Sequence, residues 1–220
     1  MEKHCYSIRY VWEIPVRVTH WINVITIVTL ATTGYFIGNP QSLALSPESF
    51  IMGWVRFVHF MAAYVFTISV LARLYWSLVG NKYAGWRNYF PWISATGRQR
   101  MADTLRYYLF LSKKVPHVVG HNPMALVAYS VLMVLFLLMI LSGFALYAQY
   151  APGSFLQRVT SPLFLLFSNQ TVRLGHHFIM WLIIGFVIQH IYTCWLMDVK
   201  ERGGIFSSIF SGYKTVEDDE

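Results

Sequence analysis

The sequence has few charged side chains for its length. Only 12% of its 220 residues are Asp, Glu, Lys or Arg, whereas 56% are hydrophobic and 17% are aromatic. Because soluble domains typically carry about 25% charged residues, this composition excludes an ordinary soluble domain. It indicates an integral membrane protein.

Cysteine is also scarce. Cys5 and Cys194 lie near opposite ends of the sequence, and Cys194 is inside an apolar segment. They form neither a disulfide framework nor a metal-binding motif. The Cys-x-x-Cys-His motif is absent, so any bound haem would be held by axial ligands and not by thioether bonds.

Acidic residues are fewer than basic ones, which leaves a formal net charge of +7. A basic protein can bind nucleic acid, but these Lys and Arg residues flank apolar runs and form no basic face. Membrane topology explains their positions better. We therefore expect a lipid bilayer, and no nucleic acid, as a partner.

Long apolar segments predict four membrane-spanning helices, since about 20 apolar residues cross a hydrocarbon core of about 30 Å. The predicted spans are residues 18–37, 55–79, 123–150 and 174–197. We expect an all-α integral membrane protein in which these helices form a four-helix bundle. Residues 1–220 then make up a single membrane domain.

The segments between the spans differ in character. Residues 82–122 are basic and aromatic, which is typical of a segment on the membrane surface, and residues 99–112 are predicted to form an amphipathic helix. Residues 161–167 are apolar but too short to cross, so we expect them to dip into the interface. The polar tail, residues 198–220, is predicted to be frayed.

The distribution of Lys and Arg predicts the orientation. The N-terminal segment, the 82–122 connector and the tail together hold thirteen, whereas the opposite connectors hold three: Arg56, Arg158 and Arg173. By the positive-inside rule, we expect a protein of the bacterial inner membrane with both termini on the cytoplasmic side.

Four histidines lie near the ends of predicted spans. His20 and His190 are at the cytoplasmic level, and His59 and His176 are at the outer level. Fourteen residues at about 100° each leave His176 and His190 about 40° apart around the last span, whereas His177 is roughly 140° away from His190. We therefore expect His176, and not His177, to share a face with His190.

Two histidine pairs result, His59 with His176 and His20 with His190. Each pair joins different helices at one depth, as two axial ligands on opposite faces of a haem require. We therefore predict two non-covalent haem b groups, with iron bound by these four histidines. A zinc site is the weaker alternative, because zinc needs three or four ligands around one ion and the pairs are about 20 Å apart by helix rise.

Arginines recur near the histidines. Arg17, Arg56 and Arg173 each precede a predicted ligand by three residues, about one helical turn. They are candidates for pairing with haem propionates, and snorkelling to the interface is an equal alternative. Arg73 follows His59 by fourteen residues, so we expect it to face the inner haem, where a propionate would pair with its charge.

Two glycines and a further histidine complete the set of candidates. Gly34 follows His20 by fourteen residues and is expected to leave room for the outer porphyrin, while Gly143 relieves crowding or serves in helix packing. His121 precedes the third span on the cytoplasmic side. It is a candidate for proton delivery to a quinone, and an ordinary interfacial histidine is the alternative.

Several motifs, taken together, resemble one family. They are RVTHW (17–21), GYFIG (34–38), RFVHF (56–60), RLYWSLVGN (73–81), GHNPMA (120–125), SGFALY (142–147) and FVIQHIY (186–192). The sequence in this respect resembles the cytochrome b subunits of membrane-bound nickel-iron hydrogenases, within the di-haem group that includes formate dehydrogenase gamma subunits. The resemblance implies that His20, His59, His176 and His190 are the haem ligands.

The resemblance also implies partners. A periplasmic hydrogenase, with a nickel-iron large subunit and an iron-sulfur small subunit, would deliver electrons, and menaquinone or ubiquinone would receive them. The chain would then be the electron-transfer subunit of a hydrogen:quinone oxidoreductase. A subunit of formate dehydrogenase or of another periplasmic oxidoreductase is one alternative, and a transporter or haem-free structural anchor is another.

Overall fold

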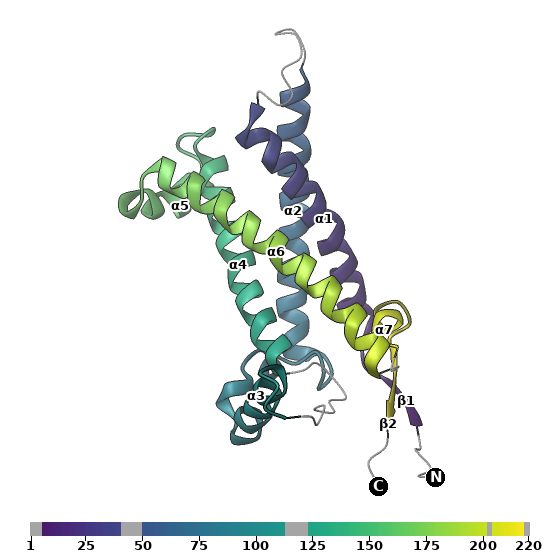
Figure 1. The fold of residues 1–220 in the computed structure, drawn as a ribbon. Helices are drawn as coiled ribbons and strands as arrows, with labels where there is room; N and C mark the ends of the chain where they lie inside the picture. The colour runs from purple at the N-terminus through teal and green to yellow at the C-terminus, as the bar shows by residue number, and fades with distance from the viewer. Residues whose placement is uncertain (1–5, 41–49, 113–122, 202–203, 218–220) are drawn as a thin grey trace. The chain divides into compact units, whose positions relative to one another are not determined.

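The computed structural model describes residues 6–40, 50–112, 123–201 and 204–217. Four long helices run through this described part of the chain: α1 (Ile14–Gly38), α2 (Ile51–Val79), α4 (Pro123–Ala148) and α6 (Asn169–Glu201) (Figure 1). Each contains an 18-residue stretch that is apolar enough to cross a membrane. The predicted helical membrane fold with four spanning helices is confirmed.

Three of these helices begin before their apolar runs, because helical hydrogen bonding continues into polar turns. In α1 the backbone N–H of Arg17 donates to the Glu13 carbonyl, one residue before the helix starts. At the start of α6 the Ser168 hydroxyl accepts from the Thr171 N–H at 3.1 Å, which satisfies one of the free donors of the first turn. Hydropathy therefore locates the part that crosses the membrane, and capping locates the helix ends.

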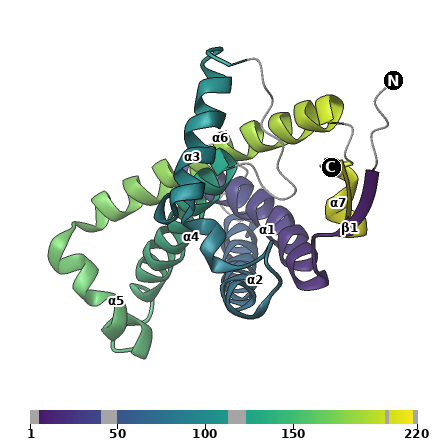
Figure 2. The ribbon, with the colours of Figure 1, turned by 90° about the horizontal axis from the view of Figure 1, so that it is seen from below.

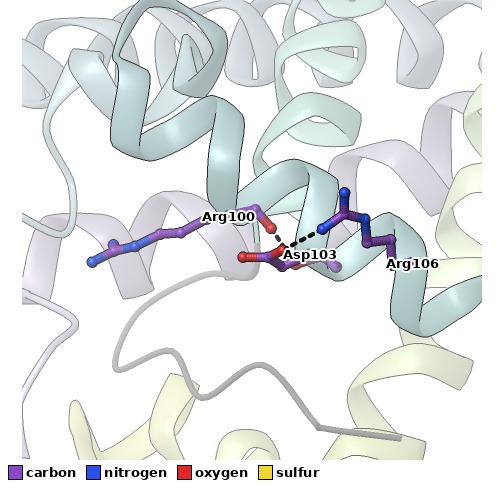
Figure 3. Close-up of polar contacts among 4 residues, drawn as sticks. Arg100, Asp103 and Arg106 are labelled. Atoms are coloured by element: carbon purple, nitrogen blue, oxygen red, sulfur yellow. Dashed lines mark hydrogen bonds and ion pairs between the residues drawn. The ribbon is translucent and has the colours of Figure 1, made fainter. Parts of the chain in front are cut away.

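The basic connector contains two 3₁₀ turns, η2 (Trp86–Tyr89) and η3 (Pro91–Ile93), and helix α3 (Ala95–Tyr108). The predicted amphipathic helix therefore exists but begins four residues earlier than expected, because Ser94 caps it by accepting from the Gly97 N–H. In Figure 3 the Arg106 guanidinium reaches the Asp103 carboxylate, while the Arg100 side chain extends away. The 3.4 Å ion pair is exposed and adds little stability.

Helix α5 (Phe155–Leu166) occupies the connector between α4 and α6. Its twelve residues span about 18 Å, which is too short to cross a bilayer. Phe155, Val159 and Leu166 are exposed at helical spacing, so α5 presents an apolar face. This agrees with the expectation that residues 161–167 do not form a span.

The expectation of a frayed tail is wrong for residues 205–217. These residues form α7 (Ile205–Ser211) and strand β2 (Tyr213–Glu217), which pairs antiparallel with β1 (Tyr6–Tyr10), as Figure 1 shows. Figure 2 shows α7 beside β1. The Trp12 indole donates to the Ser208 hydroxyl at 3.1 Å. The tail is ordered by these contacts with the N-terminal segment, which its local charge pattern does not reveal.

The chain divides into two compact units. Unit 1 comprises residues 1–20, 71–132 and 189–220, and unit 2 comprises residues 21–70 and 133–188. Unit 1 contains both terminal strands and the basic connector, the segments that the charge count assigns to one side of the membrane. Each predicted histidine pair lies within one unit: His20 and His190 in unit 1, and His59 and His176 in unit 2.

Unit 1 is closed by a half-buried network around Glu13. One Glu13 carboxylate oxygen accepts from the Trp76 indole at 2.9 Å and from the Asn81 backbone N–H at 2.8 Å. The Asn81 side-chain amide donates to the Val11 carbonyl at 3.0 Å. These bonds tie the start of α1 to the end of α2, beside a core of Val11, Trp12, Val16 and Ala84.

Candidate haem-binding site

The structure brings His20 and His190 together within unit 1. Their ring centroids are 6.3 Å apart, and the ring planes are inclined by 54°. A metal–imidazole bond is about 2 Å long, so two rings on opposite sides of one ion have centres roughly 6 Å apart. The separation of the inner pair therefore suits a shared metal ion.

His190 has two polar neighbours. The Tyr129 hydroxyl, on α4, lies 3.2 Å from the Nδ1 atom of His190. The Cys194 sulfur lies 3.7 Å from the same nitrogen, one helical turn further along α6. No role was predicted for Tyr129, because a tyrosine in a membrane helix carries no spacing signal of its own.

Unit 2 contains the other predicted pair, His59 on α2 and His176 on α6. The Thr33 hydroxyl of α1 lies 2.9 Å from the Nδ1 atom of His59. The Ser142 hydroxyl of α4 lies 2.8 Å from the Nδ1 atom of His176. Each outer histidine is therefore oriented by a hydroxyl on a different helix.

Two glycines lie directly against the outer imidazoles. A Cβ atom added at Gly34 would lie 3.3 Å from the Cε1 atom of His59, and one added at Gly143 would lie 3.2 Å from the Cε1 atom of His176. The space beside Gly34 is thus filled by the His59 ring. Room for a porphyrin at Gly34 stays a prediction.

These observations test whether the residues suit a haem. Haem iron in proteins is bound by axial imidazoles, and metal-binding histidines usually engage their second ring nitrogen in a hydrogen bond. At His59, His176 and His190 the Nδ1 atom has a hydroxyl neighbour within 3.2 Å. Nε2 is then the nitrogen available to iron, so the residues fit the cofactor.

Within the described residues, no group of three or more His, Cys, Asp or Glu side chains comes together in a way that could bind a zinc ion. Among these residues the His20 and His190 rings lie close together. His121 lies outside the described residues, so its predicted part in proton delivery stays a prediction.

The structure places the four candidate arginines differently. Arg17 donates to the Phe210 carbonyl, and its buried Nε atom has no hydrogen-bond partner among the described residues. Arg173 is exposed and donates to Asn169 at 2.7 Å, and Arg56 is exposed. Of the three arginines that precede ligands, Arg17 is therefore the best placed for an anionic partner.

Arg73 faces the connector that follows α2. Both of its terminal nitrogens lie 3.4 Å from the Ala84 carbonyl, and its guanidinium lies 5.6 Å from the centre of the Tyr89 ring. Burial raises the pKa of the Tyr89 phenol, and the Arg73 charge opposes that effect. Since a free phenol titrates near pH 10, Tyr89 is neutral at physiological pH.

His177 packs against Gly38 on α1. A Cβ atom added at Gly38 would lie 2.2 Å from the Cε1 atom of His177, so this contact requires glycine. No role was predicted for His177, and the structure shows it in a helix-packing contact.

Filling the space at Gly143 is expected to weaken haem binding. In a Gly143→Leu variant the new side chain displaces the His176 ring, and we expect haem affinity at this site to fall by about tenfold or more. Gly185→Leu is the matched control, because among the described residues nothing lies within 4 Å of a Cβ added there. Haem titration of both variants measures the difference; equal affinities would show that the approach to Gly143 is unimportant.

The fold and the hydrogen-bonded histidines define a multi-pass helical membrane protein with histidines in its spanning helices, a residue type that serves as an axial ligand of haem. Comparison with known proteins gives its family. The chain belongs to the prokaryotic cytochrome b561 family, whose model matches residues 11–212.

Curated relatives agree with this assignment. The chain is 40% identical over 216 residues to a probable Ni/Fe-hydrogenase B-type cytochrome subunit of Cupriavidus necator, covering 95% of this chain and 88% of the relative. It is 36% identical to similarly described subunits of Rhodobacter capsulatus, covering 96% and 82%, and of Escherichia coli K12, covering 94% and 90%. The resemblance predicted from the sequence motifs is confirmed.

Proposed function

We propose that this chain is the b-type cytochrome subunit through which a nickel-iron hydrogenase passes electrons to quinone. The observation that carries the proposal is the presence of one histidine pair in each compact unit, with ring nitrogens already oriented by hydroxyl groups. The names of the relatives supply the hydrogenase as electron donor.

His59 and His176 would hold one haem b, and His20 and His190 a second. Haem supplies a centre that accepts and gives up single electrons. The chain's own contribution is to provide the axial nitrogens, to orient them, and to surround them with apolar helices that exclude water. Arg17, Arg56, Arg73 and Arg173 are candidates for the propionates, and the orphaned Nε atom of Arg17 favours Arg17 among them.

Sidedness follows from the charge distribution. With both termini and the basic connector in the cytoplasm, His20 and His190 would lie toward the cytoplasmic side of the bacterial inner membrane, and His59 and His176 toward the periplasmic side. The small and large hydrogenase subunits would dock in the periplasm. Menaquinone or ubiquinone would be reduced near the inner pair with cytoplasmic protons, for which His121 is the candidate donor.

Hydrogen-dependent reduction in native membranes tests this function. Supplying hydrogen is expected to convert the b-type haem of this chain to its reduced form, seen in its visible spectrum. Adding an oxidised quinone analogue is expected to restore the oxidised spectrum. Formate, given to the same membranes, is the control for the donor. Reduction by formate but not by hydrogen would overturn the proposed partner.

A further inference from the structure

Each of the two outer histidines contacts a hydroxyl residue that is followed by a glycine, and the two contacts are on different helices. On α1, Thr33 lies beside the Nδ1 atom of His59 and Gly34 beside its Cε1 atom. On α4, Ser142 lies beside the Nδ1 atom of His176 and Gly143 beside its Cε1 atom. In both places a hydroxyl residue directly precedes a glycine, so each imidazole rests edge-on against a helix backbone.

The hydroxyl protons of Thr33 and Ser142 are already used in hydrogen bonds to backbone carbonyls. The Thr33 hydroxyl donates to the Thr29 carbonyl at 2.6 Å, and the Ser142 hydroxyl donates to the Leu138 carbonyl at 2.6 Å. A hydroxyl has one proton, and a carbonyl oxygen can only accept. Turning that proton toward the histidine would leave two oxygen atoms facing each other at 2.6 Å.

The direction of the second hydrogen bond follows. Since the hydroxyl oxygens have only lone pairs left, the Nδ1 atoms of His59 and His176 must be the donors, at 2.9 and 2.8 Å. Each ring is therefore held with its proton on Nδ1 and an unprotonated Nε2. A neutral imidazole with a free Nε2 lone pair is the form that binds a metal.

The hydrogen bond donated by Nδ1 also affects the reduction potential of an iron bound at Nε2. A hydrogen bond donated by the far nitrogen of a metal-bound imidazole makes the ligand more basic, and hydrogen bonding to the ligands is one of the means by which a protein sets haem potential. A more basic ligand favours ferric over ferrous iron. Two such bonds act on the same centre, because His59 and His176 form one pair.

We propose that Thr33 and Ser142 are positioning residues of the outer haem site, which fix the tautomer of its two ligands and lower its reduction potential. This rests on the proposed assignment of His59 and His176 as haem ligands. The inner pair is built differently, because the polar neighbours of His190 are the Tyr129 phenol and the Cys194 thiol. The two haems are thereby given unlike ligand environments, which suits transfer of electrons in one direction.

Thr33→Val and Ser142→Ala test the proposal, with redox titration of the purified cytochrome as the readout. Each variant is expected to shift the ferric-to-ferrous ratio of one haem by up to about tenfold at a fixed potential, toward the ferrous form. For a one-electron couple this is a rise of about 59 mV. The other haem is expected to keep its potential.

Two kinds of control separate the hydroxyl from general packing. Ser142→Thr keeps the hydroxyl and is expected to retain the original potential. Thr32→Val removes the neighbouring hydroxyl, which donates only to the Val28 carbonyl among the bonds seen, and is expected to change neither haem. If Ser142→Ala lost haem while Ser142→Thr kept it, the positioning role would be supported.

The outcomes that overturn the proposal are distinct from failure of the proposed function. Haem bound with unchanged potentials in both Thr33→Val and Ser142→Ala would overturn it, as would equal haem loss in Ser142→Ala and Ser142→Thr. Absence of haem from the unaltered protein would instead contradict the cytochrome assignment itself.

Discussion

Replacing His176 with alanine is expected to halve the haem content of the purified protein, from two haems per chain to one. The reason is that His59 would keep no partner of its own depth, and one imidazole holds haem poorly where two are required. His190→Ala is expected to empty the other site. The pyridine haemochrome assay, which quantifies haem b, and a redox titration together show which centre is lost.

His177→Ala is the matched control, because it removes an adjacent imidazole of the same size. The His177 ring packs against Gly38, so its loss is expected to loosen a contact between α1 and α6 and to leave both haems bound. Loss of haem from the His177 variant, with full haem in the His176 variant, would reverse the assignment of the ligand.

Replacing Glu13 with alanine is expected to give the largest loss of stability outside the histidine sites. The Trp76 indole and the Asn81 backbone N–H would both lose their acceptor. Both donors are half-buried, and a hydrogen bond to a charged group contributes roughly 1.5–3 kcal/mol. The thermal unfolding midpoint of the detergent-solubilised protein, compared at one scan rate, is expected to fall clearly.

Two further variants make the Glu13 result interpretable. Asp103→Ala removes an equally negative side chain whose partner, Arg106, is exposed, and is expected to cost at most about 1 kcal/mol. Glu13→Gln keeps an accepting oxygen and is expected to recover part of the loss. Equal midpoints for Glu13→Ala and Asp103→Ala would show that the network does not close unit 1.

The spanning helices could be predicted from sequence because one local property specifies them. A run of about 20 apolar residues has few structures open to it in a bilayer other than a helix. The helix ends were less predictable. At α3, which Ser94 caps, the helix begins at Ala95, four residues before the expected position. Helix ends depend on single capping side chains, which hydropathy averages away.

The terminal sheet could not be predicted, because its two strands are separated by most of the chain. Nothing local in residues 213–217 identifies residues 6–10 as their partner. The same limit applies to the Glu13 network, where the acceptor directly precedes α1 and the Trp76 donor is on α2. Non-local hydrogen bonds become visible only once the fold is known.

At the candidate site, helical periodicity favours His176 over His177 as a ligand, and this choice stays a prediction. Periodicity does not show what surrounds a ring, so Thr33, Ser142 and Tyr129 were missed as hydrogen-bond partners. A signal existed for two of them, since Thr33-Gly34 and Ser142-Gly143 repeat a hydroxyl residue followed by glycine. Without the facing histidines, that repeat has no evident meaning.

Haem quantified per chain, together with a reduced-minus-oxidised visible spectrum of the purified protein, shows whether two haems lie between these helices. If both histidine pairs bind haem, dithionite produces b-type absorption and the protein contains two haems per chain. One haem per chain would show that one histidine pair does not bind iron. No reducible absorption in the intact purified protein would show that these histidines hold no haem.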